Sequence, residues 1–179
     1  MGKLNCGQAQ IEEIPSRNPA FERYAPDRKR VAEESQAAVY LDFMTRAELD
    51  RLQANDFKST WAESYRRPVH LFNATVGNEV VGVADLRTQT AARDGYALVE
   101  PIYVIKACWQ HGVGRKLWEA CAAAAHTEGA PGMQVVSLDG NTRGRRFYER
   151  TLKLTKLHAE SVTIGDRVFP ATRYEVPNW

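Results

Sequence analysis

The sequence lacks a long apolar run. No stretch approaches the roughly 18 consecutive apolar residues that a membrane-spanning helix requires. The segment that follows Met1 also lacks the apolar core of a secretory signal. We therefore expect a cytoplasmic protein with no membrane contact.

Cysteine is scarce as well. The three cysteines, Cys6, Cys108 and Cys121, are odd in number and widely spaced, and no two of them form a Cys-x-x-Cys pair. This pattern argues against structural zinc and against a disulfide framework. We expect no bound metal, and three free thiols would fit a reducing compartment.

The sequence has no large excess of charge. Lys and Arg number 24 against 22 Asp and Glu, which leaves a net charge of +2. A balance this even gives no broad electrostatic surface for nucleic acid, which is not an expected partner. One local basic run stands out: Arg143, Arg145, Arg146, Arg150, Lys153 and Lys156. Its side chains either form a solvated helix face or contact a phosphate group, and we favour the solvated face.

What remains is an ordinary globular composition, with 44% hydrophobic and 26% charged residues. A chain of 179 residues suits one domain, so we expect residues 1–179 to fold as a single unit. Residues 1–27 are the least patterned because three prolines interrupt them. They form an irregular arm, or contribute a first strand at Gln10–Ile14.

Two helices are expected next. Apolar spacing predicts the first from Asp27 to about Met44, beginning after Pro26, although residues 38–44 could instead form a strand. Thr45 and Glu48 have the spacing of a capping box, which starts a second helix running towards Tyr65.

The rest of the chain alternates strands and helices. Two hairpins are predicted, one around Gly77-Asn78 and one around Gly165-Asp166. Pro101 interrupts an apolar strand, where it removes a ladder bond or marks a bulge. The expected strands are 69–76, 79–86, 96–105, 133–138, 156–164 and 167–176, and the expected helices are 113–127 and 141–151. This order indicates a mixed α/β structure with helices packed on a sheet.

The segment from Val104 to Arg115 joins a strand to a helix through the turn Gly112-Val113-Gly114. Free N–H groups at such a helix start favour an anion, and a pyrophosphate is the natural ligand. The turn is not a dinucleotide fingerprint, because Leu117 stands where the third glycine belongs. The Walker phosphate motif is also absent.

A second motif follows the buried strand 133–138. It reads Asn141-x-x-Gly144-x-x-Phe147-Tyr148. The glycine turn and this motif, in this order, resemble the GNAT superfamily of acyl-CoA-dependent N-acyltransferases over residues 69–176. Four features depart from the family pattern. Trp109 replaces Gln or Arg, Gln110 stands where glycine is common, and Gly144 stands where alanine is common. The Gly-Phe pair that often follows the tyrosine helix is replaced by Leu152-Lys153.

The resemblance implies a GNAT-like fold. That fold has a mostly antiparallel central sheet of six to seven strands, splayed between the fourth and fifth and flanked by about four helices. It also implies acetyl-CoA as the cofactor. The pantetheine arm would bind the strand residues Ile102, Tyr103 and Val104 together with Asn141. The phosphates would bind the turn residues Trp109, Gln110, His111, Gly112, Val113, Gly114 and Arg115.

The same resemblance assigns Tyr148 as the acid that protonates the departing thiolate. Glu100 is our candidate general base, although it could equally be a structural residue beside Pro101. The sequence thus predicts acetyl transfer to a primary amine of a small molecule or a protein, directly within a ternary complex. A non-catalytic acyl-CoA-binding or regulatory module is the alternative, and a homodimer is left open.

The acceptor is expected to bind parts of the chain that vary within the family. Here these are residues 27–66, the 87–95 loop and the closing hairpin, with Trp61, Tyr65 and Trp109 as aromatic candidates for its wall. Three histidines, His70, His111 and His158, are more consistent with structural or solvated positions than with catalysis.

Overall fold

The computed structural model describes residues 4–14, 21–54, 69–88 and 95–177. The helices are η1 (Cys6–Gln8), α1 (Phe21–Tyr40), η3 (Lys106–Cys108), α3 (Val113–Thr127), α4 (Thr142–Arg146) and η4 (Phe147–Thr151). The strands are β1 (Gln10–Ile14), β2 (Val69–Val76), β3 (Glu79–Arg87), β4 (Ala97–Val104), β5 (Gly132–Leu138), β6 (Thr155–Ile164) and β7 (Arg167–Pro177). Residues 46–54 are also helical.

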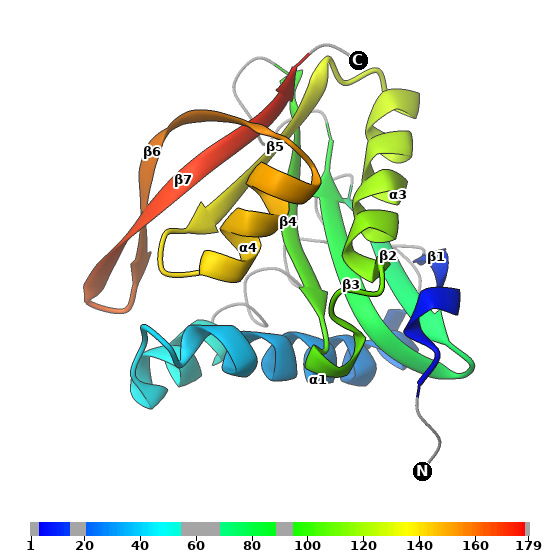
Figure 1. Cartoon of the computed structure of the whole chain (residues 1–179), viewed down its shortest axis with the longest axis horizontal. Coiled ribbons are helices and arrows are strands. Elements are labelled where there is room, and N and C mark those ends of the chain that lie inside the picture. The colour runs from blue at the N-terminus through cyan, green and yellow to red at the C-terminus, as the bar shows by residue number, and fades with distance from the viewer. Residues whose placement is uncertain (1–3, 15–20, 55–68, 89–94, 178–179) are drawn as a thin grey trace.

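The seven strands form one sheet in the order β1-β2-β3-β4-β5-β7-β6 (Figure 1). Every neighbouring pair is antiparallel except β4 and β5, which are parallel. That parallel pairing is short, joining only Ala97–Val99 to Met133–Val135. Beyond it the two strands diverge, so the predicted splay between the fourth and fifth strands is confirmed.

The main core lies between the sheet and α3. Val113, Leu117 and Cys121 of this helix are buried, and the helix contacts β2, β3 and β4. On the other side of the sheet, α1 contacts β3 and β4 and crosses below them in Figure 1. Within the described part of the chain, no helix is long and apolar enough to cross a membrane.

The first helix begins earlier than predicted. It starts at Phe21 and contains Pro26, whereas the sequence predicted a start at Asp27, after this proline. Phe21 is buried against Ile14 and Leu71, so tertiary packing offsets the backbone hydrogen bond that proline removes. The alternative strand over residues 38–44 is wrong, because the helix continues to Tyr40 and a turn follows.

The capping box at the second helix is confirmed. The Thr45 N–H donates to Glu48 Oε2 at 2.7 Å, and the Glu48 N–H donates to Thr45 Oγ1 at 3.3 Å. The remainder of that predicted helix, residues 55–65, lies outside the described residues, as do Trp61 and Tyr65.

Pro101 marks a bulge, which is one of the two alternatives that the sequence offered. Opposite β3, Ala84 pairs with Ile102 but Leu86 pairs with Val99, so β4 contains one extra residue there. The extra residue bends the strand at Glu100. Both predicted hairpins and the strand at Gln10–Ile14 are also confirmed.

The expectation of three free thiols is wrong. Cys6 and Cys108 form a disulfide, and only Cys121 is free within the described residues. The fold brings together two cysteines that are 102 residues apart, because η1 packs beside the loop that follows β4. With two of the three cysteines in a disulfide, the cysteine pattern does not support the expected reducing compartment.

Candidate active site

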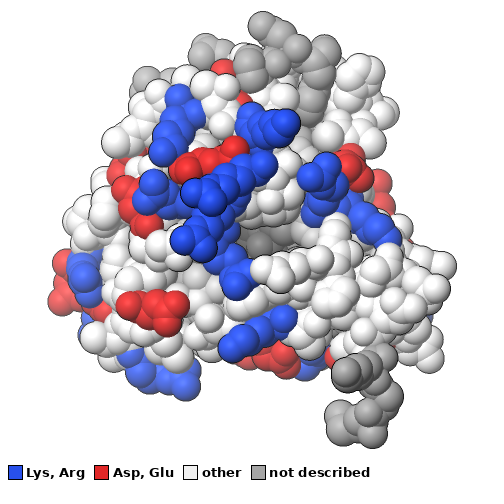
Figure 2. Space-filling view, in the orientation of Figure 1, with Lys and Arg blue, Asp and Glu red and all other residues white. Residues whose placement is uncertain are grey.

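A cavity of about 1170 Å³ opens where β4 and β5 diverge. Its walls come from α1, the ends of β4 and β5, the start of α3, and α4 with η4. Figure 2 shows the hollow near the centre of the face. It gathers all the predicted site residues except His111: Glu100, Ile102, Tyr103, Val104, Trp109, Gln110, Gly112, Val113, Gly114, Arg115, Asn141 and Tyr148.

One end of the cavity is the N-terminus of α3. Gly112 is its N-cap, with a left-handed φ of 82°, and no side chain caps the helix. The first-turn N–H groups have no partner within the helix and carry its positive dipole end. Since nothing lies within 4 Å of where a Gly112 Cβ would be, the turn is open to a ligand. This end can bind an anion.

Cationic side chains surround the same end. Arg115 of α3 and Arg143, Arg146 and Arg150 of α4 and η4 line the cavity, and lysines and arginines crowd its upper rim in Figure 2. Arg145 and Lys156 instead pair with Glu149. The basic run is therefore only partly a solvated face, because three of its members line the cavity.

The β4 wall offers backbone groups. The Ile105 N–H bonds Val81 of β3, so the alternate residue Val104 directs its backbone towards the splay. The Val104 carbonyl accepts a hydrogen bond from Trp109 Nε1 at 2.7 Å. The Tyr103 hydroxyl accepts one from Gln36 Nε2 at 2.8 Å.

Tyr148 lies deep in the cavity and is 7% exposed. Its ring contacts the rings of Phe147, Trp118 and Tyr174, with centroids 5.5, 6.4 and 5.6 Å away. The hydroxyl has no hydrogen bond to any described residue. Burial raises the Tyr148 pKa above its ordinary value, so the phenol stays protonated near neutral pH. It can donate a proton and cannot readily act as a base.

The helix that carries Tyr148 is unusual. The predicted helix 141–151 consists of α4 followed by a π-helical turn, η4, in which the Leu152 N–H donates to the Phe147 carbonyl at 3.0 Å. Asn141 caps the helix, since its Oδ1 accepts from the Gly144 N–H at 2.8 Å. Single π-turns of this kind occur often at functional sites.

Glu100 lies at the bulge of β4 and lines the cavity. Its Oε1 is 2.8 Å from Arg87 Nε, and its side chain is 23% exposed. This exposure allows a ligand to approach the carboxylate, which Arg87 holds at the cavity wall.

A second ion pair, Arg28 with Asp85, lies buried at the cavity wall. Arg28 also donates to the Phe72 carbonyl at 3.0 Å and to Asn73 Oδ1 at 2.6 Å. Burial raises the pKa of Asp85 and outweighs the opposing effect of Arg28. The sequence reasoning missed this pair. An Asp within the apolar strand Glu79–Leu86, and an Arg on the apolar face of the preceding helix, were the available signals.

The remaining candidates lie elsewhere. His70 Nδ1 is 2.7 Å from Glu13, and His158 Nε2 is 2.9 Å from Glu160. Neither histidine lines the cavity, and the exposed His111 bonds the Trp109 carbonyl through Nδ1 at 2.8 Å. Cys108 does line the cavity, but it is in the disulfide and offers no free thiol.

Comparisons with solved structures agree with this fold. A Thermoplasma acidophilum PaiA N-acetyltransferase, solved with coenzyme A, is 13% identical, with a TM-score of 0.67 over 93% of this chain and 99% of its own. A GCN5-related N-acetyltransferase from Rhodopseudomonas palustris is 17% identical, with a TM-score of 0.71 over 94% and 95%. A Bacillus anthracis protein described as a streptothricin acetyltransferase, solved with acetyl coenzyme A, is 20% identical, with a TM-score of 0.55 over 62% and 64%.

No protein among the curated sequences matches this chain. The model of the acetyltransferase (GNAT) family, however, matches residues 31–153, which include the glycine turn, Glu100 and Tyr148. That match covers more than half of the sequence. The chain belongs to the GNAT acetyltransferase family.

Proposed function

We propose that the protein transfers an acetyl group from acetyl-CoA to a primary amine, directly within a ternary complex. The observation that carries the proposal is the placement of one protonated hydroxyl, that of Tyr148, in the same cavity as the uncapped N-terminus of α3. A thioester ligand anchored by its phosphates at that helix would direct its sulfur into the cavity.

Acetyl-CoA fits the residues that are present. The N-terminus of α3 and the arginines beside it suit a pyrophosphate. The backbone of β4 beyond Val99 has no partner in β5 and suits an extended arm that carries amides. Two proteins of the same fold were solved with coenzyme A or its acetyl ester, which supports the assignment.

When bound, the cofactor supplies an activated acetyl group, whose carbon gains a bond to nitrogen as its bond to sulfur breaks. The protein's own residues would manage the protons. Glu100, which pairs with Arg87, would accept a proton from the incoming ammonium group, directly or through water. Tyr148 would donate its proton to the departing sulfur, which would leave as a thiol. The Tyr148 oxygen would then recover a proton from the acylated nitrogen, directly or through water, because that nitrogen still carries one proton more than an amide.

The acceptor would enter from the α1 side of the cavity. Arg28, Ala32 and Ser35 of α1 line that side together with Val162 and Ile164 of β6. The Ser35 hydroxyl is buried and has no hydrogen bond to any described residue, so it is available to a polar group of the acceptor.

The test begins with calorimetric titration of acetyl-CoA into the protein, and binding in the micromolar range is expected. A panel of small amines and lysine peptides is then screened for acceptor-dependent release of free thiol. Absence of binding at millimolar cofactor would refute the proposal. Binding without thiol release for any acceptor would instead support the non-catalytic module.

A further inference from the structure

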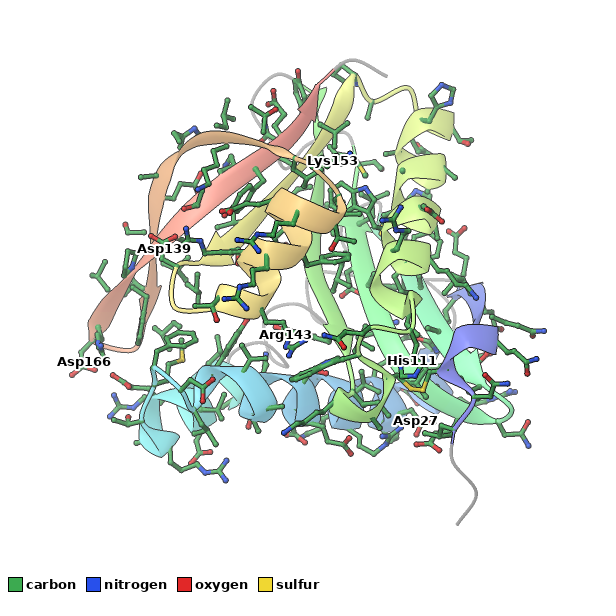
Figure 3. The ribbon with its side chains drawn as sticks, in the orientation of Figure 1. Asp27, His111, Asp139, Arg143, Lys153 and Asp166 are labelled. Atoms are coloured by element: carbon green, nitrogen blue, oxygen red, sulfur yellow. A yellow bond between two sulfur atoms is a disulfide. The ribbon has the colours of Figure 1, made fainter. Side chains whose placement is uncertain are left out.

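Two side chains meet across the mouth of the cavity. Trp109 belongs to the loop that follows β4, and Arg143 belongs to the first turn of α4, which follows β5. The Arg143 guanidinium carbon lies 3.9 Å from the centroid of the Trp109 ring, a close cation–π contact. Figure 3 shows Arg143 reaching out of α4 into the space between α4 and α1. The pair therefore joins the two walls that the splayed sheet separates.

The indole of Trp109 also uses a backbone acceptor. Its Nε1–H donates to the Val104 carbonyl at 2.7 Å. Val104 directs this carbonyl towards the splay, where β5 no longer pairs with β4. In a regular sheet that carbonyl would accept an amide N–H from the next strand. Here the indole N–H of Trp109 takes that place.

A ligand that lies along β4 as an added strand would need the same acceptor. We infer that Trp109 competes with the amide-bearing arm of the cofactor for the Val104 carbonyl, so that binding of the arm exchanges one hydrogen bond for the other. This inference rests on the proposed function for the identity of the ligand. Trp109, held in place by Arg143, would thus control the affinity of the cleft for coenzyme A.

The exchange has a physical cost that can be measured. A ligand amide that replaces the indole gains one hydrogen bond only after another has broken, so the net gain at Val104 is close to zero. Removing the indole donor would leave the carbonyl to water. A bound amide would then contribute the net worth of an ordinary hydrogen bond, which corresponds to about a two- to tenfold gain in affinity.

The first experiment observes the indole N–H groups of the full chain by nitrogen–proton correlation spectroscopy. Trp109→Phe identifies the Trp109 signal by its loss. In the free protein that N–H should exchange slowly with solvent because it is bonded to Val104. Arg143→Gln should speed the exchange, because it removes the stacked guanidinium. Addition of coenzyme A should shift the Trp109 signal.

The second experiment measures coenzyme A affinity by calorimetry for wild type, Trp109→Phe and a matched control, Trp118→Phe. Trp118 is a second indole, buried in the core beside Tyr148, but it does not line the cavity and makes no hydrogen bond to any described residue. We expect the Kd to fall about two- to tenfold in Trp109→Phe and to change by less than twofold in Trp118→Phe.

Each outcome decides a separate question. If coenzyme A does not bind wild type, the proposed function fails and the inference fails with it. If coenzyme A binds and the Trp109 signal does not move, or if Trp109→Phe binds equally or more weakly, the competition is refuted and the proposed function stands. A melting temperature for every variant separates these results from loss of the fold.

Discussion

Replacement of Tyr148 by phenylalanine isolates a single oxygen atom. The aromatic contacts with Phe147, Trp118 and Tyr174 remain, because the ring is unchanged. The hydroxyl has no hydrogen bond to a described residue, so its removal leaves no protein group without a partner. We expect the free energy of unfolding to change by no more than about 0.5 kcal/mol.

The effect on catalysis should be much larger. A general acid in position contributes about 10²–10⁴-fold to the rate, which corresponds to about 3–5 kcal/mol of barrier height. Because burial raises the pKa of Tyr148, the wild-type phenol should not lose its proton near neutral pH. The loss of turnover in the variant should therefore be nearly constant between pH 6 and about 9.

The assay is steady-state release of free thiol with saturating acetyl-CoA and an amine identified by screening. Tyr174→Phe is the control, since that ring is adjacent to Tyr148 but its hydroxyl donates to Glu149 at 2.8 Å and does not line the cavity. The control should lose about 1 kcal/mol of stability and keep its turnover. If Tyr148→Phe retains turnover within threefold of wild type and binds acetyl-CoA normally, the assigned acid role is wrong.

Three further predictions test other parts of the molecule. Gly112→Val places a branched side chain at a left-handed φ of 82°, which costs about 1–2 kcal/mol, and it should weaken acetyl-CoA binding at least tenfold by calorimetry; equal affinity would mean that the turn does not bind the phosphates. Cys6→Ser removes the disulfide to Cys108, which closes a loop of 102 residues, so the free energy of unfolding should fall by up to about 4–5 kcal/mol in chemical denaturation. A dithiol reductant should lower the stability of the wild type and leave that of the variant unchanged. A hydrogen bond from Arg167 lowers the pKa of Glu48 from 4.5 to about 2, so this carboxylate stabilises the fold above pH 4.5 and loses that contribution as pH falls towards 2. In Glu48→Gln the melting temperature should therefore fall less steeply than in wild type between pH 4.5 and 2. Equal slopes in the two proteins would contradict this role of Glu48.

Most of the sheet could be predicted from the sequence because its hairpin turns are specified by local residues. Both hairpins lie around short polar turns with glycine, Gly77-Asn78 and Gly165-Asp166, which can be recognised without knowledge of distant packing. The irregularity at Pro101 could be predicted for the same reason, since a proline has no backbone N–H to donate to a neighbouring strand.

Features that depend on distant packing could not be read in this way. The start of α1 at Phe21 depends on a pocket made by Ile14 and Leu71, not on any local signal. The disulfide joins residues 102 apart and needs the folded contact between η1 and the β4 loop. In the candidate site, the motifs predicted which residues line the cavity, but the contact of Trp109 with Arg143 exists only once the sheet has splayed.

The short parallel pairing of β4 with β5 has a mechanical consequence. Four strands form one antiparallel leaf and three form another. Among the residues that the structure describes, only the pairing of Ala97–Val99 with Met133–Val135 joins the leaves within the sheet. Each leaf is held by its own continuous ladders, which do not cross the cleft. The cleft can therefore widen or narrow by flexing about this seam while both ladders stay intact. Such a motion would have to keep or break the contact of Trp109 with Arg143, which links the two walls outside the sheet.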